Sequence, residues 1–244
     1  MSGSCFAERL TSLVSLTPAE HRALERLEDR QRNLRRGAVL QRENDRSNEL
    51  YVLKTGMMMS SVLLDDGSRQ ILRFLFPGDM MGESALVYGE APETLTAVTD
   101  AVVCPFERPA FATLIVEHPR LAALIMVYAQ VERVSLTDRL ASLGRTSAKA
   151  RVAALLLELR NRMRGLDTEL GAAFTLGLTQ EEIADATGLT AVHVNRMLRQ
   201  LEDERLIARE NGRVTIVNEK QLIRAANFVD RTQGLDLGWL PAAR

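Results

Sequence analysis

Residues 179–198 read TQEEIADATGLTAVHVNRML, two short amphipathic segments separated by one glycine. Thr179 and Glu182 have the spacing of a capping box, in which two side chains satisfy the free amide groups at a helix start. Gly188 is suited to the positive φ that ends a helix, and Thr190 can cap the next helix. The stretch therefore predicts two helices that meet over a short turn.

The second predicted helix, Thr190–Glu202, has an apolar side and an unusual polar side. Val194, Leu198 and Leu201 recur at helical spacing and predict the buried side. The other side carries Val192, His193, Asn195, Arg196 and Arg199. His193 is most simply a solvated or phosphate-facing residue, and a base contact is its alternative role. Arginine can bind guanine O6 and N7, asparagine can bind adenine N6 and N7, and valine can meet a thymine methyl. This face predicts a helix that reads the major groove of DNA.

The stretch LIARENGRVTIV, residues 206–217, follows this helix and predicts two strands joined by a type I′ turn at Asn211-Gly212. A hairpin in this position is a wing. Arg205, Arg209 and Arg213 lie here and are candidates for phosphate contact. For each of them the alternative, a solvated surface charge balanced by acidic neighbours, stays open.

The N-terminal half has a different pattern. After a short predicted helix from Pro18 to about Arg32, residues 34–108 are rich in β-branched and apolar side chains interrupted by glycine and proline turns. Asp65-Asp66-Gly67 is the clearest hairpin turn. Short strands at this spacing predict an antiparallel barrel or sandwich, and with the C-terminal helices they give an α+β fold.

A long helical pattern, from about Pro119 to Leu143, joins the two parts. One apolar stripe along it consists of Leu121, Leu124, Tyr128 and Val131. We favour this stripe as the seam of a homodimer, and the alternative is that it packs on its own domain. Gly144 is the predicted hinge, and Thr146 or Ser147 can cap the helix that follows.

These patterns divide the 244 residues into five segments. We expect an N-terminal tail and helix at 1–33, a β-barrel sensor domain at 34–108, a linking and dimerisation helix at 109–144, a winged helix-turn-helix at 145–217 and a C-terminal tail at 218–244.

The composition of the chain bears on its binding of DNA, its place in the cell and the state of its cysteines. The 31 Lys and Arg against 32 Asp and Glu neither support nor exclude DNA binding, so affinity for phosphate must come from local clustering. The N-terminus lacks the pattern of an export signal and no stretch has the length of a membrane span, so we expect a cytoplasmic protein without a membrane partner. Cys5 and Cys104 form no CxxC pair and are expected to be reduced thiols.

The sequence gives little support for catalysis. No Ser, Cys or carboxylate has a recognisable catalytic spacing to a histidine, and no glycine-rich phosphate loop follows a strand. We therefore predict no catalytic residues and no enzyme. The competing hypothesis is an effector-binding barrel protein whose helical C-terminus contacts a protein partner.

The stretch LTQEEIADATGLTAVHVNRMLRQLEDERLI resembles the helix-turn-helix of the Crp/Fnr family of bacterial transcription regulators. GSRQILRFLFPGDMMGESAL is similar to the cyclic-nucleotide-binding-like jelly roll of the same family, closer to its Fnr-like branch. The resemblance implies a homodimer that binds a palindromic operator in double-stranded DNA, with the barrel as sensor and RNA polymerase as a further partner. It also implies that Arg196 reads a base and that Thr179 and Gln180 contact the DNA backbone.

Two departures from the family pattern alter these expectations. Val192 stands where many members have a base-reading glutamate, so the usual half-site is not assumed. The cyclic-nucleotide receptors clamp the phosphate with an Arg-Ser pair, but here residues 74–107 contain no Lys, Arg or His. An anionic ligand there would lack a counter-charge, so we expect that cyclic AMP is not the effector. A regulator controlled by its own abundance, without an effector, is the alternative. The candidate effector pocket consists of Arg69, Arg73, Gly82, Glu83 and Thr94.

No cofactor is predicted. Cys5 and Cys104 resemble two of the cluster ligands of Fnr-type sensors, but two thiolates are fewer than the four that an iron-sulfur cluster usually takes. His21, His118 and His193 are scattered and give no support for haem.

Overall fold

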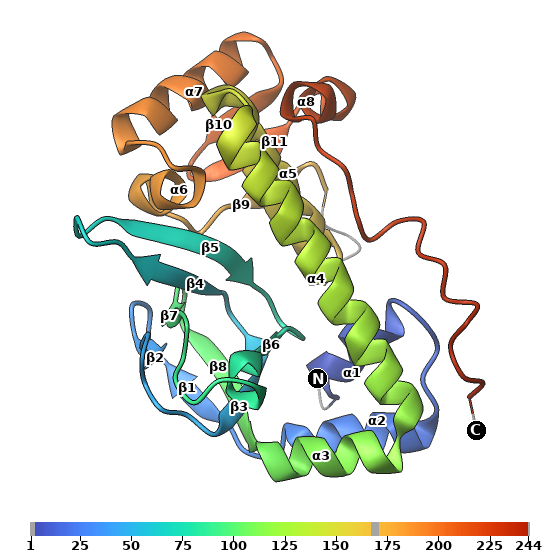
Figure 1. Cartoon of the computed structure of the whole chain (residues 1–244). Coiled ribbons are helices and arrows are strands. Elements are labelled where there is room, and N and C mark those ends of the chain that lie inside the picture. Colours follow the sequence, from blue (N-terminus) through green and yellow to red (C-terminus); the bar gives the residue numbers. More distant parts are fainter. Residues whose placement is uncertain (1–2, 167–170, 244) are drawn as a thin grey trace. The chain divides into compact units, whose positions relative to one another are not determined.

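The computed structural model describes residues 3–166 and 171–243, shown with their elements in Figure 1. The chain divides into two compact units. The first comprises the residues up to Val62, Phe74–Arg133 and the residues from Gly234, and the second comprises Leu63–Arg73 and Val134–Gln233. The helix α4, Pro119–Arg145, contributes residues to both units.

Residues 32–107 contain two four-stranded antiparallel sheets rather than the closed barrel named as one possibility from the sequence. The first sheet has the order β1-β8-β3-β6, with β1 at Arg32–Leu34, β8 at Ala101–Glu107, β3 at Glu49–Thr55 and β6 at Met80–Met81. The second has the order β2-β7-β4-β5, with β2 at Val39–Gln41, β7 at Thr94–Ala97, β4 at Met58–Leu63 and β5 at Arg69–Leu75.

Successive side chains of β3 point alternately into two different apolar clusters. Tyr51 and Leu53 belong to the apolar cluster between the two sheets, whereas Leu50 and Val52 belong to a cluster formed with helices. A strand that is buried on both faces must be apolar at successive positions. The helices of the second cluster are α1 at Cys5–Thr11, α2 at Pro18–Leu27, α3 at Arg108–Glu117 and the first turns of α4. Figure 1 shows α2 and α3 side by side.

The turns predicted in this half are confirmed. Gly67 has φ 83° and its amide donates to the Leu64 carbonyl at 2.9 Å, which closes the hairpin between β4 and β5. A short 3₁₀ helix, η1 at Glu83–Leu86, begins after Gly82, whose φ is 74°.

A buried ion pair joins helices of the first unit. The Arg120 guanidinium donates to both Glu20 oxygens, at 2.9 and 2.8 Å, and to the carbonyls of Ser15 and Pro241, each at 3.0 Å. Leu240 packs against the same apolar cluster. The segment from Gly234 onward is therefore anchored on the first unit, which the sequence pattern did not indicate.

The second unit is mainly helical. Its helices are α5 at Ala148–Arg164, α6 at Gln180–Thr187, α7 at Ala191–Asp203 and α8 at Glu219–Ala226. A small antiparallel sheet has the order β10-β11-β9, with β10 at Ile207–Glu210, β11 at Arg213–Ile216 and β9 at Ala173–Thr175. Ser147 caps α5 by accepting from the Ala150 amide at 3.2 Å, as one of the two predicted caps.

Within the described part of the chain, no single helix has both the length and the apolar composition of a membrane span. The helices α3 and α4 meet that test only as a pair bent by 116°.

Candidate nucleic-acid interface

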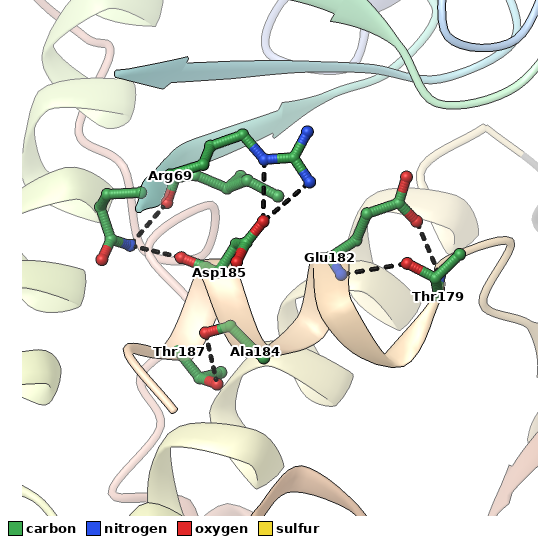
Figure 2. Close-up of polar contacts among 8 residues, drawn as sticks. Arg69, Thr179, Glu182, Ala184, Asp185 and Thr187 are labelled. Atoms are coloured by element: carbon green, nitrogen blue, oxygen red, sulfur yellow. Dashed lines mark hydrogen bonds and ion pairs between the residues drawn. The ribbon is translucent and has the colours of Figure 1, made fainter. Parts of the chain in front are cut away.

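The helix α6 starts as the sequence predicted. The Thr179 amide donates to Glu182 Oε2 at 2.6 Å, and the Glu182 amide donates to Thr179 Oγ1 at 3.1 Å (Figure 2). Gly188 ends the helix with φ 62° and ψ 42°. The residues at which α6 begins and ends are therefore set by the local sequence.

The helix α7 is capped by Thr190, whose hydroxyl accepts from the His193 amide at 3.3 Å. Its buried side consists of Val194, Met197, Leu198 and Leu201, in agreement with the predicted stripe. Val192 on the opposite side is 81% exposed. A single exposed valine is common on protein surfaces, so this value places Val192 on the open face of α7 and does not by itself indicate a partner.

Arg196 lies one turn after Val192 and is exposed. Its guanidinium makes no hydrogen bond or ion pair with any residue in 3–166 or 171–243. Arg199 is also exposed and belongs to the same face, because it follows Val192 by seven residues. A guanidinium without an internal partner keeps its five N–H donors for an external acceptor.

Asn195 has a partner that the sequence did not reveal. Gln180 Nε2 donates to Asn195 Oδ1 at 2.8 Å, and Asn195 Nδ2 donates to Gln180 Oε1. Sequence reasoning assigned the two residues separate contacts with DNA. They are 15 residues apart, and only the angle between α6 and α7 brings them together.

The wing has the predicted turn, since Asn211 and Gly212 both have positive φ, at 51° and 75°. Of its arginines, Arg209 donates to Glu202 at 2.6 Å and lowers the pKa of that carboxyl. Arg209 is therefore engaged within the chain. Arg213 is exposed, with one long hydrogen bond to the Ala173 carbonyl at 3.4 Å, and Arg205 is exposed at φ 55°.

The C-terminal end of α6 is held by side chains from three other elements. Its last carbonyls accept from Gln70 of β5, Arg139 of α4 and Arg151 of α5, at 2.8, 3.0 and 2.9 Å. Cationic donors suit this end because helix carbonyls there lack partners and carry partial negative charge. The far end of the helix is thus fixed by residues distant in sequence.

Arg69 completes this contact. Its Nε and Nη2 atoms bind Asp185 Oδ2 of α6 at 2.8 and 2.7 Å (Figure 2). The candidate effector pocket included Arg69, but in the structure its guanidinium is committed to Asp185. Strand periodicity predicts the face of the sheet on which a side chain lies, and it gives no information on contacts with a helix more than a hundred residues away.

The other candidate pocket residues also have local roles. The Thr94 hydroxyl accepts from the Glu43 amide at 3.0 Å. Gly82 has positive φ, and a Cβ there would lie 3.3 Å from the Tyr51 ring, so glycine is required by both backbone and space. Glu83 starts η1, and Arg73 is half-buried on β5.

The apolar stripe of α4 is occupied within the chain. Leu121, Leu124 and Tyr128 are buried, with 0, 0 and 4% exposure, in the helical cluster of the first unit. Val131 is half-buried. The stripe favoured as a dimer seam is therefore core over three of its four positions, the alternative that periodicity alone left open.

The two thiols lie in protected surroundings. Burial raises the pKa of the Cys104 thiol to about 11, and the Cys5 thiol donates to the Lys54 carbonyl at 3.4 Å. A raised pKa disfavours the thiolate that ligates metals. Across residues 3–166 and 171–243, no three His, Cys, Asp or Glu side chains are grouped so as to hold a metal ion.

Comparison with known families matches both parts of the chain. Residues 31–118 match the cyclic nucleotide-binding domain, and residues 150–225 match the Crp-like helix-turn-helix domain.

Two proteins that are similar to this chain in sequence carry the names of regulators. The nitrogen fixation regulation protein FixK of Bradyrhizobium diazoefficiens is 34% identical over 206 residues, which cover 84% of each chain. The transcriptional activatory protein AadR of Rhodopseudomonas palustris is 31% identical over 218 residues, which cover 89% of each chain. The solved structure of FixK2 from Bradyrhizobium japonicum has a TM-score of 0.71 and 25% identity, and the match covers 80% of this chain and 96% of that one.

Proposed function

This chain belongs to the Crp/Fnr family of transcription regulators, and from that premise we propose that it acts as a homodimer whose two α7 helices read a palindromic operator in double-stranded DNA. A twofold dimer would present its recognition helices about 34 Å apart, one turn of DNA. We therefore expect half-sites separated by one helical turn.

The observation that carries the proposal is the state of Arg196. It is exposed on the face of α7 that also presents Val192, and no residue of the described chain binds its guanidinium. Bidentate contact with guanine O6 and N7 needs a guanidinium that is free in this way. Thr179, Gln180 and Thr190 lie at helix starts, where backbone amides favour phosphate. His193 and Arg199 are further candidate contacts on α7.

The test compares two arginines in gel mobility shifts with the protein's own promoter region and with random DNA. Arg196→Ala should cost about 1 to 3 kcal/mol per half-site and abolish specificity, because it removes a base contact. Arg213→Ala should weaken all sequences alike and lower the salt dependence. Equal losses on both DNAs for both variants would refute the assignment.

The dimer is supported by a second face of α4, formed by residues alternately four and three apart. This face consists of Ala122, Met126, Ala129, Arg133, Leu136 and Leu140. Met126, Leu136 and Leu140 are 54, 40 and 71% exposed. Such spacing is that of the a and d positions of a coiled coil, and a central polar residue such as Arg133 would help to fix the register. We propose this face as the seam in place of the buried stripe.

Two negative charges placed on that face test the proposed seam. Leu136→Glu with Leu140→Glu should give monomers in sedimentation and lose operator binding, because each monomer would keep one half-site. Ala141→Glu is the matched control, exposed beside the seam on the same helix. Leu124 is unsuitable because it lies in the core. A dimer that persists in the double variant would contradict this seam.

For the sensor we propose that cyclic AMP is not its effector and that it holds no cluster or haem. The support is the absence of Lys, Arg and His from residues 74–107 and the burial of Cys104. We further propose that the protein is not an enzyme and that it acts in the cytoplasm with RNA polymerase as a partner. The competing function, a helical C-terminus that contacts a protein, predicts that Arg196 is dispensable for binding nucleic acid.

A further inference from the structure

Gln180 and Asn195 form a closed pair of side-chain amides between the first and second helices of the helix-turn-helix. Each amide donates to the carbonyl oxygen of the other, at 2.8 Å in one direction. Gln180 is the first residue of α6 and is exposed, whereas Asn195 is half-buried in the second turn of α7. The pair thus connects the start of one helix to the DNA-facing side of the other.

The chemistry of an amide limits what Asn195 can do while this pair exists. A side-chain amide has one edge on which a carbonyl lone pair and an N–H point in the same direction. Bidentate recognition of adenine N6 and N7 uses that edge. The pair with Gln180 uses the same edge, so the two contacts exclude each other. Opening the pair to bind adenine would exchange two hydrogen bonds for two others and add none.

We propose that Asn195 is a positioning residue that holds Gln180 and the start of α6 against α7, and that it does not read adenine. This rests on the proposed DNA-binding function. Outside the pair each amide keeps one N–H, and that of Gln180 lies at the helix start that would meet the DNA backbone. Base reading is then left to Arg196 and Val192, and the operator has no adenine requirement opposite Asn195.

The experiment compares Asn195→Ala, Gln180→Ala, the double variant and the swapped pair Gln180→Asn with Asn195→Gln. The swap keeps both amides and the total number of methylene groups. Base preference is obtained by selection from random DNA, and affinity is measured on the selected operator. Each alanine variant should lose roughly two- to tenfold in affinity, the range of one or two neutral hydrogen bonds.

If the pair forms, the double alanine variant should bind the operator no more weakly than the single variant with the lower affinity. All four variants should keep the base preferences of the wild type, and the swap should recover most of the affinity. If Asn195→Ala relaxes a preference for adenine at one position while Gln180→Ala does not, Asn195 reads that base and the proposal is wrong. Additive losses without recovery in the swap would also overturn it.

A measurement without DNA separates this inference from the proposed function. In the free protein, Gln180→Ala should shift the side-chain amide resonances of Asn195, because its partner is lost, and the swap should retain a coupled pair. Unshifted resonances would mean that the pair does not form. A different result is that Gln180→Ala shifts these resonances but the folded wild-type protein shows no sequence-specific DNA binding. That result would reject the proposed function and, with it, the positioning role.

Discussion

Two arginines, one in each unit, are used in opposite ways. Arg120 in the first unit is 9% exposed and donates to four oxygen atoms of the chain, whereas Arg196 in the second unit is exposed and donates to none that the structure describes. A buried guanidinium must be fully paired because its desolvation is costly, and an exposed one without a partner costs the fold little. The difference identifies Arg120 as structural and Arg196 as available for binding.

The largest expected effect comes from removing the buried guanidinium of Arg120. Arg120→Ala should lower the free energy of unfolding of the first unit by about 3 to 5 kcal/mol, because it leaves the Glu20 carboxylate buried without its partner. The fluorescence of Trp239, the single tryptophan, reports this in urea titrations, since Arg120 also binds the neighbouring segment at Pro241.

The control for Arg120 removes both charges and keeps the helix cap. Arg120→Met with Glu20→Gln should cost much less than Arg120→Ala, because no lone charge is left buried. Burial opposes ionisation of Glu20, but hydrogen bonds from Thr17 and Arg120 hold its pKa below the ordinary value. The stability from the pair is therefore full at neutral pH and lost only as the pH falls through that lowered pKa. A double variant as unstable as Arg120→Ala would contradict the pairing argument.

The next effect concerns the proposed sensor domain, where residues 74–107 offer no Lys, Arg or His to an anionic effector. Leaving one phosphate charge uncompensated costs several kcal/mol, and a loss of about 4 kcal/mol turns a micromolar site into a millimolar one. Calorimetry with cyclic AMP and cyclic GMP should therefore show no binding at micromolar concentration. A micromolar dissociation constant for either nucleotide would break this view, and Arg73 would be the first residue to substitute.

The smallest effect concerns Arg69, whose exposure lies between that of Arg120 and that of a fully exposed arginine. Arg69 and Asp185 are 36% and 26% exposed, so their coupling in a cycle of Arg69→Gln and Asp185→Asn should be at most about 1 kcal/mol and should fall with added salt. Arg35 and Asp100, at 91% and 64%, are the matched control and should show almost no coupling. Equal coupling in both pairs would mean that exposure does not set their strength.

The elements that sequence predicted well are those determined by neighbours along the chain. The Thr179 capping box, the positive φ of Gly188 and the turn at Asn211-Gly212 all occur as expected, because each depends on residues within a few positions. The strand β9 and the helix α1 were not predicted, since β9 forms only by pairing with β11 and α1 is a short helix that packs on other elements.

The sequence by itself determined the helix-turn-helix and the family. Residue spacing sets which side chains share a face, and local caps set where helices start and end. Only the tertiary structure decided which faces are already occupied: the stripe of Leu121 and Leu124 packs in the core, Arg69 binds Asp185, and Asn195 pairs with Gln180. Periodicity cannot distinguish a face that packs inside the chain from one that binds another molecule, because both need the same spacing, and the partner is chosen by contacts between residues far apart in sequence.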